Sequence, residues 1–69
     1  MENRIEELRK QRNYTQQALG DLLGVSRQTI ISLERGRYNP SLSLAHAIAK
    51  VFDLTIEDIF VFKENENEK

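Results

Sequence analysis

Cysteine is absent from the 69-residue chain, and histidine occurs once, as His46. Without cysteine the chain can form neither disulfides nor thiolate metal sites, which is typical of proteins from a reducing compartment. A single histidine cannot by itself build a metal site or pair with a cysteine in catalysis. The sequence also has no phosphate-binding glycine loop and no grouping of a nucleophile with a base. We therefore expect no metal, no cofactor and no enzyme activity, and we assign His46 no role.

Long apolar runs are absent as well, because no stretch approaches the about 20 apolar residues that a transmembrane helix needs. The first residues, MENRIEE, are too charged for a signal peptide. These absences predict a cytoplasmic protein without a membrane partner. A chain of this length forms one domain that buries only about 60% of the surface of its unfolded chain, so its stability would gain from dimerisation.

An overall excess of positive charge is also missing, since the formal net charge is −1. The charge is unevenly distributed, however. Residues 1–52 hold eight Lys and Arg against five Asp and Glu, a net +3, whereas residues 53–69 hold two against six, a net −4. Arg27, Arg35 and Arg37 lie close together in the basic part, where they could form a local anion-binding surface. Residues 63–69 contain no apolar side chain. They are predicted to be a disordered acidic tail after a domain of residues 1–62.

The stretch that organises the chain is residues 16–36, which has the pattern of two short helices around a glycine turn. Thr15 and Ser26 each precede a helical pattern and carry a hydroxyl that can cap it, so helices are predicted to begin at 16 and 27. Gly24 suits the left-handed turn between them, and Gly20 suits a close crossing of the two helices. The inward positions at helical spacing are Ala18, Leu19, Leu22, Leu23, Ile30 and Leu33. A helix-turn-helix over residues 16–35 is predicted.

Three further helices are expected around this pair. Residues 3–12 form the first, which Asn13 ends. Residues 42–52 form another, which Ser41 caps. Thr55 and Asp58 resemble a capping box that opens the last, through Ile56, Ile59 and Phe60. The predicted fold is therefore a compact all-α domain of five helices, and the β-branched and aromatic residues 61–63 favour a short C-terminal strand.

Three segments carry a resemblance to a known family: TQQALGDLLGVSRQTI, ERGRYNPSL and IEDIF. Together they resemble the phage Cro and repressor type of helix-turn-helix regulator, the XRE family, over residues 1–60. The resemblance implies that the first helix of the pair crosses the DNA backbone and the second enters the major groove. It further implies a transcriptional regulator, most often a repressor, that binds an inverted-repeat double-stranded DNA operator as a homodimer. An antitoxin and a restriction-modification controller are alternatives on the same fold.

Under this interpretation two groups of side chains contact DNA. Amide and guanidinium groups on the second helix can read adenine and guanine in the major groove. The predicted base-reading residues are Ser26, Arg27, Gln28, Ile31 and Ser32. The predicted DNA-backbone residues are Gln16, Thr29, Arg35, Arg37 and Tyr38. Ser26 and Thr29 also have simpler roles, as a helix cap and a helix-surface hydroxyl.

Three further predictions concern residues that could contact another part of the protein or a second protein chain. Arg9 could face phosphate or pair with Glu34 between helices; the pair is favoured, so both are left out of the DNA site. Ile31 could touch a thymine methyl or belong to a protein-docking surface, in which the acidic tail would be the recognition segment. The apolar residues Phe60, Val61 and Phe62 exceed what a small core needs and are predicted to contact the second copy. The sequence does not specify the operator, the regulated genes or an effector.

Overall fold

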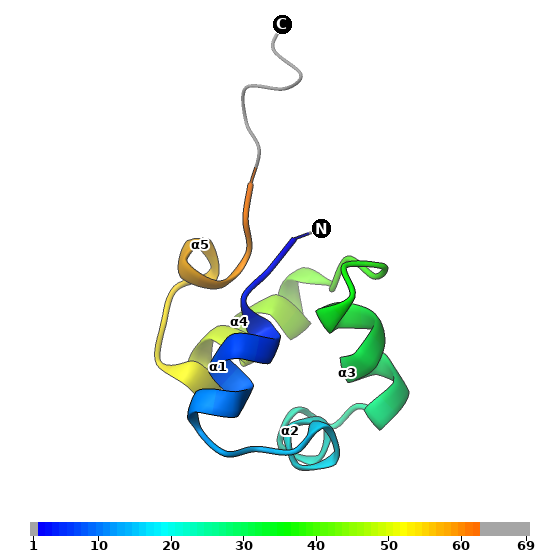
Figure 1. Ribbon diagram of the computed structural model, residues 1–69. Coiled ribbons are helices and arrows are strands. Elements are labelled where there is room, and N and C mark those ends of the chain that lie inside the picture. Colours follow the sequence, from blue (N-terminus) through cyan, green and yellow to red (C-terminus); the bar gives the residue numbers. More distant parts are fainter. Residues whose placement is uncertain (1, 63–69) are drawn as a thin grey trace, which may run out of the picture.

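The computed structural model describes residues 2–62, and within them the chain forms five helices (Figure 1). These are α1 (Ile5–Gln11), α2 (Gln16–Leu23), α3 (Arg27–Glu34), α4 (Leu42–Phe52) and α5 (Ile56–Ile59). The predicted all-α class with five helices is confirmed. In this part of the chain no helix is long and apolar enough to cross a membrane. The predicted tail, residues 63–69, lies outside the described residues.

Hydroxyl caps begin four of the helices where the sequence predicts them. The side chains of Thr15, Ser26, Ser41 and Thr55 each accept a hydrogen bond from the backbone N–H three residues later. Such a cap typically contributes about 1 kcal/mol. Thr55 and Asp58 complete a capping box, in which the Asp58 carboxylate accepts from the Thr55 backbone in return.

The turn between α2 and α3 depends on two glycines. Gly24 has a φ of 74°, the left-handed conformation predicted for it. Asn13, which follows the C-cap of α1, has the same conformation, with a φ of 61°. A Cβ added to Gly20 would lie 2.8 Å from the carbonyl oxygen of Val25. The prediction that Gly20 must be small is therefore right, but the close neighbour is the backbone of the turn itself.

The core lies where α1, α2 and α4 meet α3 and α5. Its largest fully buried side chains are Phe52, Ile5, Leu19, Ile30, Leu33, Ile48 and Ile59. The prediction that Leu22 faces inward is wrong, because Leu22 is 56% exposed. The buried face of α2 is centred on Leu19 and Gly20, and Leu22 lies a turn away on the other side of Leu19.

The two ends of the domain lie side by side (Figure 1). Asn3 forms an antiparallel β-bridge with Phe60, flanked by backbone hydrogen bonds from Arg4 to Ile59 and from residue 61 to residue 2. Asn3 is thus outside the first helix, contrary to the prediction, and its Oδ1 accepts from the backbone N–H of Ile5 at 3.0 Å. Its Nδ2 donates to a carbonyl oxygen of α3 at 2.8 Å.

Three other predicted helix ends are corrected by one residue. Arg12 is the C-cap of α1 rather than its last residue. Arg35 is the C-cap of α3 rather than its last residue. Phe60 follows α5 with an extended backbone, because it pairs with Asn3 instead of continuing the helix. Of the predicted strand at 61–63, Val61 has a ladder-type hydrogen bond, to Glu2 at 2.9 Å, and residue 63 is outside the described range.

Candidate nucleic-acid interface

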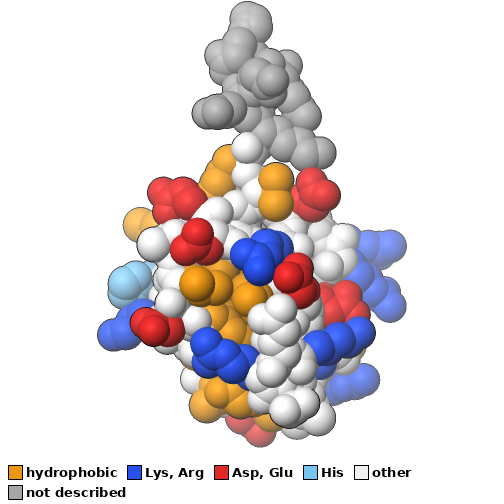
Figure 2. Space-filling view, turned by 60° about the vertical axis from the view of Figure 1, so that its left-hand side comes forward, with side chains coloured by type: hydrophobic (Ala, Val, Ile, Leu, Met, Phe, Trp, Pro, Cys, Tyr) orange, Lys and Arg blue, Asp and Glu red, His pale blue; other side chains and the backbone are white. Residues whose placement is uncertain are grey.

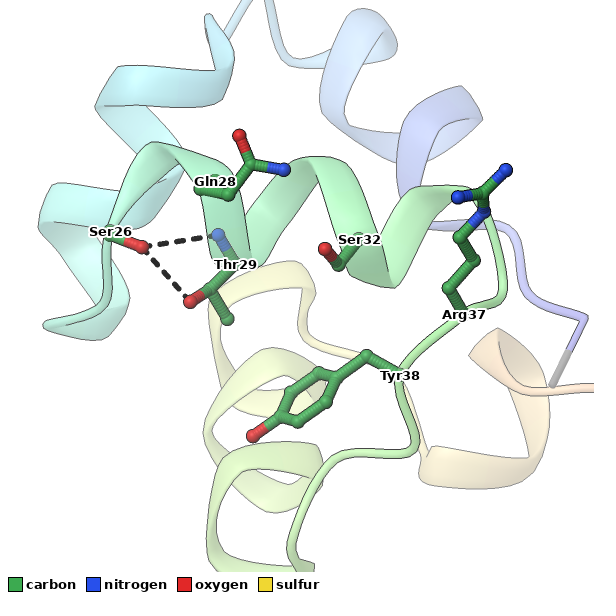
Figure 3. A pocket seen from close by; sticks show the side chains of 6 residues that line it. All are labelled: Ser26, Gln28, Thr29, Ser32, Arg37 and Tyr38. Atoms are coloured by element: carbon green, nitrogen blue, oxygen red, sulfur yellow. Dashed lines mark hydrogen bonds between the residues drawn. The ribbon is translucent and has the colours of Figure 1, made fainter.

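Two clefts run along α3, one on each side. The loop-side cleft is lined by Ser26, Gln28, Thr29, Ser32, Arg37 and Tyr38 (Figure 3). The α2-side cleft is lined by Glu6, Gln16, Arg27, Ile31, Glu34 and Arg35. All ten residues predicted from the sequence to contact DNA line one of these clefts. The structure thus places them around a single helix, and their contact with DNA stays a prediction.

The loop-side cleft exists because the chain reverses direction after α3. Gly36 has a φ of 72°, and the backbone N–H of Arg37 donates to the carbonyl of Ser32 at 3.0 Å. Tyr38, 43% exposed, extends its ring back toward Thr29, while the guanidinium of Arg37 points away from that ring (Figure 3). The turn therefore places one aromatic and one cationic side chain in the same cleft as the exposed Gln28, with Arg37 at the opposite end of α3 from Gln28 (Figure 3).

Ser26 and Thr29 use their hydroxyl groups on each other. The Oγ of Ser26 accepts from the backbone N–H of Thr29 at 3.1 Å and lies 3.0 Å from Thr29 Oγ1. This matches the simpler roles that the sequence also predicts for them. Two hydroxyl residues three positions apart at a helix start already suggest such a contact.

A buried ion pair joins Glu34, which lines the α2-side cleft, to Arg9 of α1. Arg9 donates from Nε to Glu34 Oε2 at 2.6 Å and from Nη2 to Oε1 at 3.3 Å. Its Nη1 donates to the carbonyl oxygen of Tyr14 at 2.9 Å. The hydrogen bond with Glu34 raises the pKa of Arg9 above its ordinary value. The predicted Arg9–Glu34 pair is confirmed.

Gln16 takes part in the same network, which the sequence reasoning missed. Its Nε2 donates to Glu34 Oε1 at 3.1 Å. Glu34, the last residue of α3, is thus hydrogen-bonded to the first residue of α2. Residues 16 and 34 belong to different helices, so no local spacing in the sequence indicates that they meet.

The exposed charge along α3 is mainly positive. Arg27, Arg35 and Arg37 are exposed, whereas the charge of Glu34 is balanced by Arg9. Glu6 pairs with Lys10 at 3.0 Å, and this hydrogen bond lowers the pKa of Glu6. Local basic charge such as that of Arg27, Arg35 and Arg37 attracts phosphate even when the overall charge is slightly negative. On the side of the domain that Figure 2 brings forward, acidic and basic side chains mix around a strip of hydrophobic ones.

The three residues predicted to contact a second copy differ in burial. Phe60 is 2% exposed and belongs to the core of the single chain, whereas Val61 is 41% and Phe62 is 54% exposed. Phe62 lines a hollow of about 280 Å³, which we call the apolar hollow. Its lining is Asn39, Pro40, Leu42, Ala45, Ile56, Phe60 and Phe62. None of these side chains is charged, and Leu42 is 79% exposed.

Comparisons with known proteins identify the fold as that of helix-turn-helix regulators. A family model described as helix-turn-helix matches residues 5–59. An uncharacterized helix-turn-helix-type transcriptional regulator from Archaeoglobus fulgidus is 54% identical over 66 residues, which cover 96% of this chain and 93% of that protein. The immunity repressor protein of Bacillus phage phi105 is 39% identical over 56 residues, covering 81% of this chain and 39% of the repressor. The crystal structure of the restriction-modification controller protein C.AhdI from Aeromonas hydrophila has a TM-score of 0.73 and 32% identity, covering 83% of each chain.

Proposed function

The chain belongs to the XRE-type helix-turn-helix family of DNA-binding transcriptional regulators, which are not enzymes, and on this premise we propose that it represses transcription by occupying an inverted-repeat operator as a homodimer. The observation that carries the proposal is the position of α3 between two clefts that are lined by cationic and amide side chains. An α-helix is about 10 to 12 Å across with its side chains, and the major groove of B-DNA is about 12 Å wide. In this proposal α3 lies in the major groove, and the walls of the two clefts contact its edges.

Base reading is assigned to the outward side chains of α3. Arg27 and Gln28 are exposed in its first turn, where a guanidinium can bond guanine and an amide can bond adenine with two hydrogen bonds each. Ile31 and Ser32 lie one turn further along and are half-buried. The apolar side chain of Ile31 can touch a thymine methyl group, and the hydroxyl of Ser32 can form a hydrogen bond with a base edge. Ser26 keeps its lone pairs partly engaged in the helix cap, and its contribution to base reading would be the smallest.

Backbone contacts are assigned to the outer walls of the clefts. Arg37 and Tyr38 extend from the loop after α3 (Figure 3), and Gln16 and Arg35 line the far side. Such side chains fix the position of a protein on the duplex, because phosphates are present at every step of the backbone. They give affinity, whereas the outward side chains of α3 give sequence preference.

The apolar hollow supports the homodimer. A two-fold interface joins the same surface on both subunits, so the surface must complement itself. An uncharged apolar surface meets this condition, whereas a surface of one charge sign repels its copy. In such a dimer, the exposed Leu42 and Phe62 of each subunit would pack against the apolar hollow of the other subunit. Burial of this surface would also add stability to a chain of only 69 residues.

Repression is the regulatory role that one of the named relatives favours. The phage phi105 relative is an immunity repressor, and a bound dimer can act by occupancy alone in the cytoplasm, where it would exclude polymerase. The similarity to C.AhdI favours a second role, as a restriction-modification controller. Both roles use the same DNA contacts, and the genes beside the coding sequence and the operator would distinguish them.

The test is selection of bound sequences from a random pool of double-stranded DNA, followed by gel shifts of the selected sequence at several protein concentrations. We expect an inverted repeat that binds two chains. No enrichment even at low salt would contradict DNA binding and would favour a protein-docking surface instead. Enrichment of an asymmetric site with one bound chain would contradict the homodimer alone.

A further inference from the structure

Glu34 accepts hydrogen bonds from two residues on two different helices, Arg9 of α1 and Gln16 of α2. Its carboxylate receives two hydrogen bonds from Arg9 and one from Gln16, while its side chain is only 4% exposed. An acidic group on a DNA-binding surface would normally repel phosphate. Here Arg9 balances the charge, so the carboxylate remains available as a hydrogen-bond acceptor for the Gln16 amide at the edge of the surface.

The chemistry of the carboxylate determines which way the amide of Gln16 points. A glutamine amide has a donor nitrogen and an acceptor oxygen, and it can present either one after a rotation of half a turn. The ionised carboxylate only accepts hydrogen bonds, so Glu34 holds the nitrogen side of Gln16. The bond to Glu34 uses one of the two hydrogens on Nε2, and the second hydrogen remains on the same nitrogen in the α2-side cleft.

We propose that Glu34 is a positioning residue for DNA binding, which holds the Gln16 amide so that the second N–H of Nε2 donates to a phosphate oxygen. This rests on the proposed function and adds a specific role to a residue that does not itself touch DNA. Without the carboxylate, the amide can rotate and present its oxygen, which repels phosphate. Arg27 and Arg35 line the same cleft and attract that phosphate to it.

The experiment uses the selected operator with single phosphates replaced by neutral methylphosphonates, one position at a time, and measures affinity by fluorescence anisotropy. The wild-type chain should lose about fivefold to tenfold affinity at the phosphate that Gln16 contacts. Gln16→Ala should weaken binding to unmodified DNA by a similar factor and should no longer respond to that one replacement. Glu34→Gln should behave in the same way, and the effects of the two substitutions should not add when combined. The exposed Gln17 donates to Asp21 on its own helix, so Gln17→Ala is the matched control and should keep the wild-type response.

A purely structural role for Glu34 gives a different result. Glu34→Gln would then weaken binding evenly, keep the sensitivity to that phosphate, and add its full effect to that of Gln16→Ala; any of these results overturns the proposal. If Glu34→Gln does not fold, Arg9→Met together with Glu34→Met removes both charges and the acceptor of Gln16 at once, so the same comparison is made with that pair. If the wild-type chain binds no DNA, the proposed function fails as a whole. A wild-type chain that binds the operator while Glu34 has no selective effect contradicts the positioning role alone.

Discussion

Arg9 of α1 and Glu34 of α3 are joined by an ion pair with a 2.6 Å separation between Nε and Oε2, and their side chains are only 10% and 4% exposed. Two charges removed from water cost several kcal/mol each, and their attraction offsets this only when the geometry is good and further hydrogen bonds are made. The bonds to Tyr14 and Gln16 meet that requirement. The pair therefore fixes α3 against the body of the domain, and the loss of one partner leaves a buried charge alone.

Arg9→Met should lower the free energy of unfolding by about 3 to 5 kcal/mol, because Glu34 would remain buried without a charged partner. Urea denaturation followed by circular dichroism measures this. The matched control is Lys10→Met, since Lys10 pairs with Glu6 at a site where both side chains are more than half exposed, and this change should cost well under about 1 kcal/mol. Equal effects of the two substitutions would show that the Arg9–Glu34 pair is solvated in solution.

Gly20→Ala should destabilise the domain although alanine favours helices. Its helix propensity favours alanine by about 1 kcal/mol, but the added Cβ would lie 2.8 Å from the carbonyl oxygen of Val25. Because the close atom is backbone, the turn itself must move, and we expect a net loss of about 1 to 3 kcal/mol. Thermal unfolding measures this, with Ser43→Ala on the exposed side of α4 as the control that should be neutral or slightly stabilising. A Gly20→Ala variant as stable as wild type would show that the turn adapts at little cost.

The sequence predicted those parts of the fold that depend on residues near one another in the chain. The starts of α2, α3, α4 and α5 follow from hydroxyl caps that act over three residues. The errors concern contacts between distant residues. Asn3 pairs with Phe60 instead of starting a helix, and Leu22 is exposed because α2 packs on the domain with the face centred on Leu19 and Gly20.

In the candidate site, too, the features that depend on neighbouring residues could be predicted, whereas a contact between separate helices could not. Its ten residues could be named because a helix-turn-helix has a fixed order along the chain, and the structure places all of them along α3. The link from Gln16 to Glu34 could not be predicted, because it depends on how α2 and α3 cross. The burial of Phe60 likewise depends on the N-terminal segment folding back beside it.

Acid should weaken the cap of α5. The Oδ2 of Asp58 accepts from the backbone N–H and the hydroxyl of Thr55 at 3.0 and 2.9 Å, and these hydrogen bonds lower the pKa of Asp58 below its ordinary value. An unfolded aspartate has a pKa of about 3.9, so the stabilisation is fully present above that value and is lost as the pH falls through the lower folded pKa. The difference in melting temperature between wild type and Asp58→Asn should therefore shrink as the pH falls from about 5 to about 2. A difference that stays constant over this range would contradict the assignment.

Phe62→Asp should convert a dimer into a folded monomer. The substitution places a charge at the edge of the apolar hollow, where a second copy would have to bury it, so the dimer dissociation constant should rise by at least about tenfold. Sedimentation equilibrium measures this, and Leu42→Asp should act in the same way because Leu42 lines the same hollow. Leu22→Asp is the control, since Leu22 is also an exposed leucine but lies on α2. A wild-type chain that remains monomeric at high concentration would contradict this interface.

The last prediction separates base reading from backbone contact. Gln28 is exposed in the first turn of α3, while Arg37 lies on the loop that forms the opposite wall of the same cleft (Figure 3). Gln28→Ala should cost about 1 to 3 kcal/mol on the selected operator and relax the choice of base at one position in each half-site. Arg37→Ala should weaken binding to all sequences more evenly, because a phosphate contact carries no base information.

Salt dependence gives the second measurement for the same pair of variants. If each subunit neutralises about four phosphates, the logarithm of the dimer's affinity should fall with the logarithm of salt concentration at a slope near −7. Arg37→Ala should make this slope shallower by about two, one phosphate for each subunit, whereas Gln28→Ala should leave it unchanged because an amide displaces no counterion. The half-site centres should lie about 34 Å apart, one turn of the duplex, since both copies of α3 must enter the major groove on one side. If Gln28→Ala preserves base preference while Arg37→Ala abolishes it, then the loop rather than α3 reads the sequence.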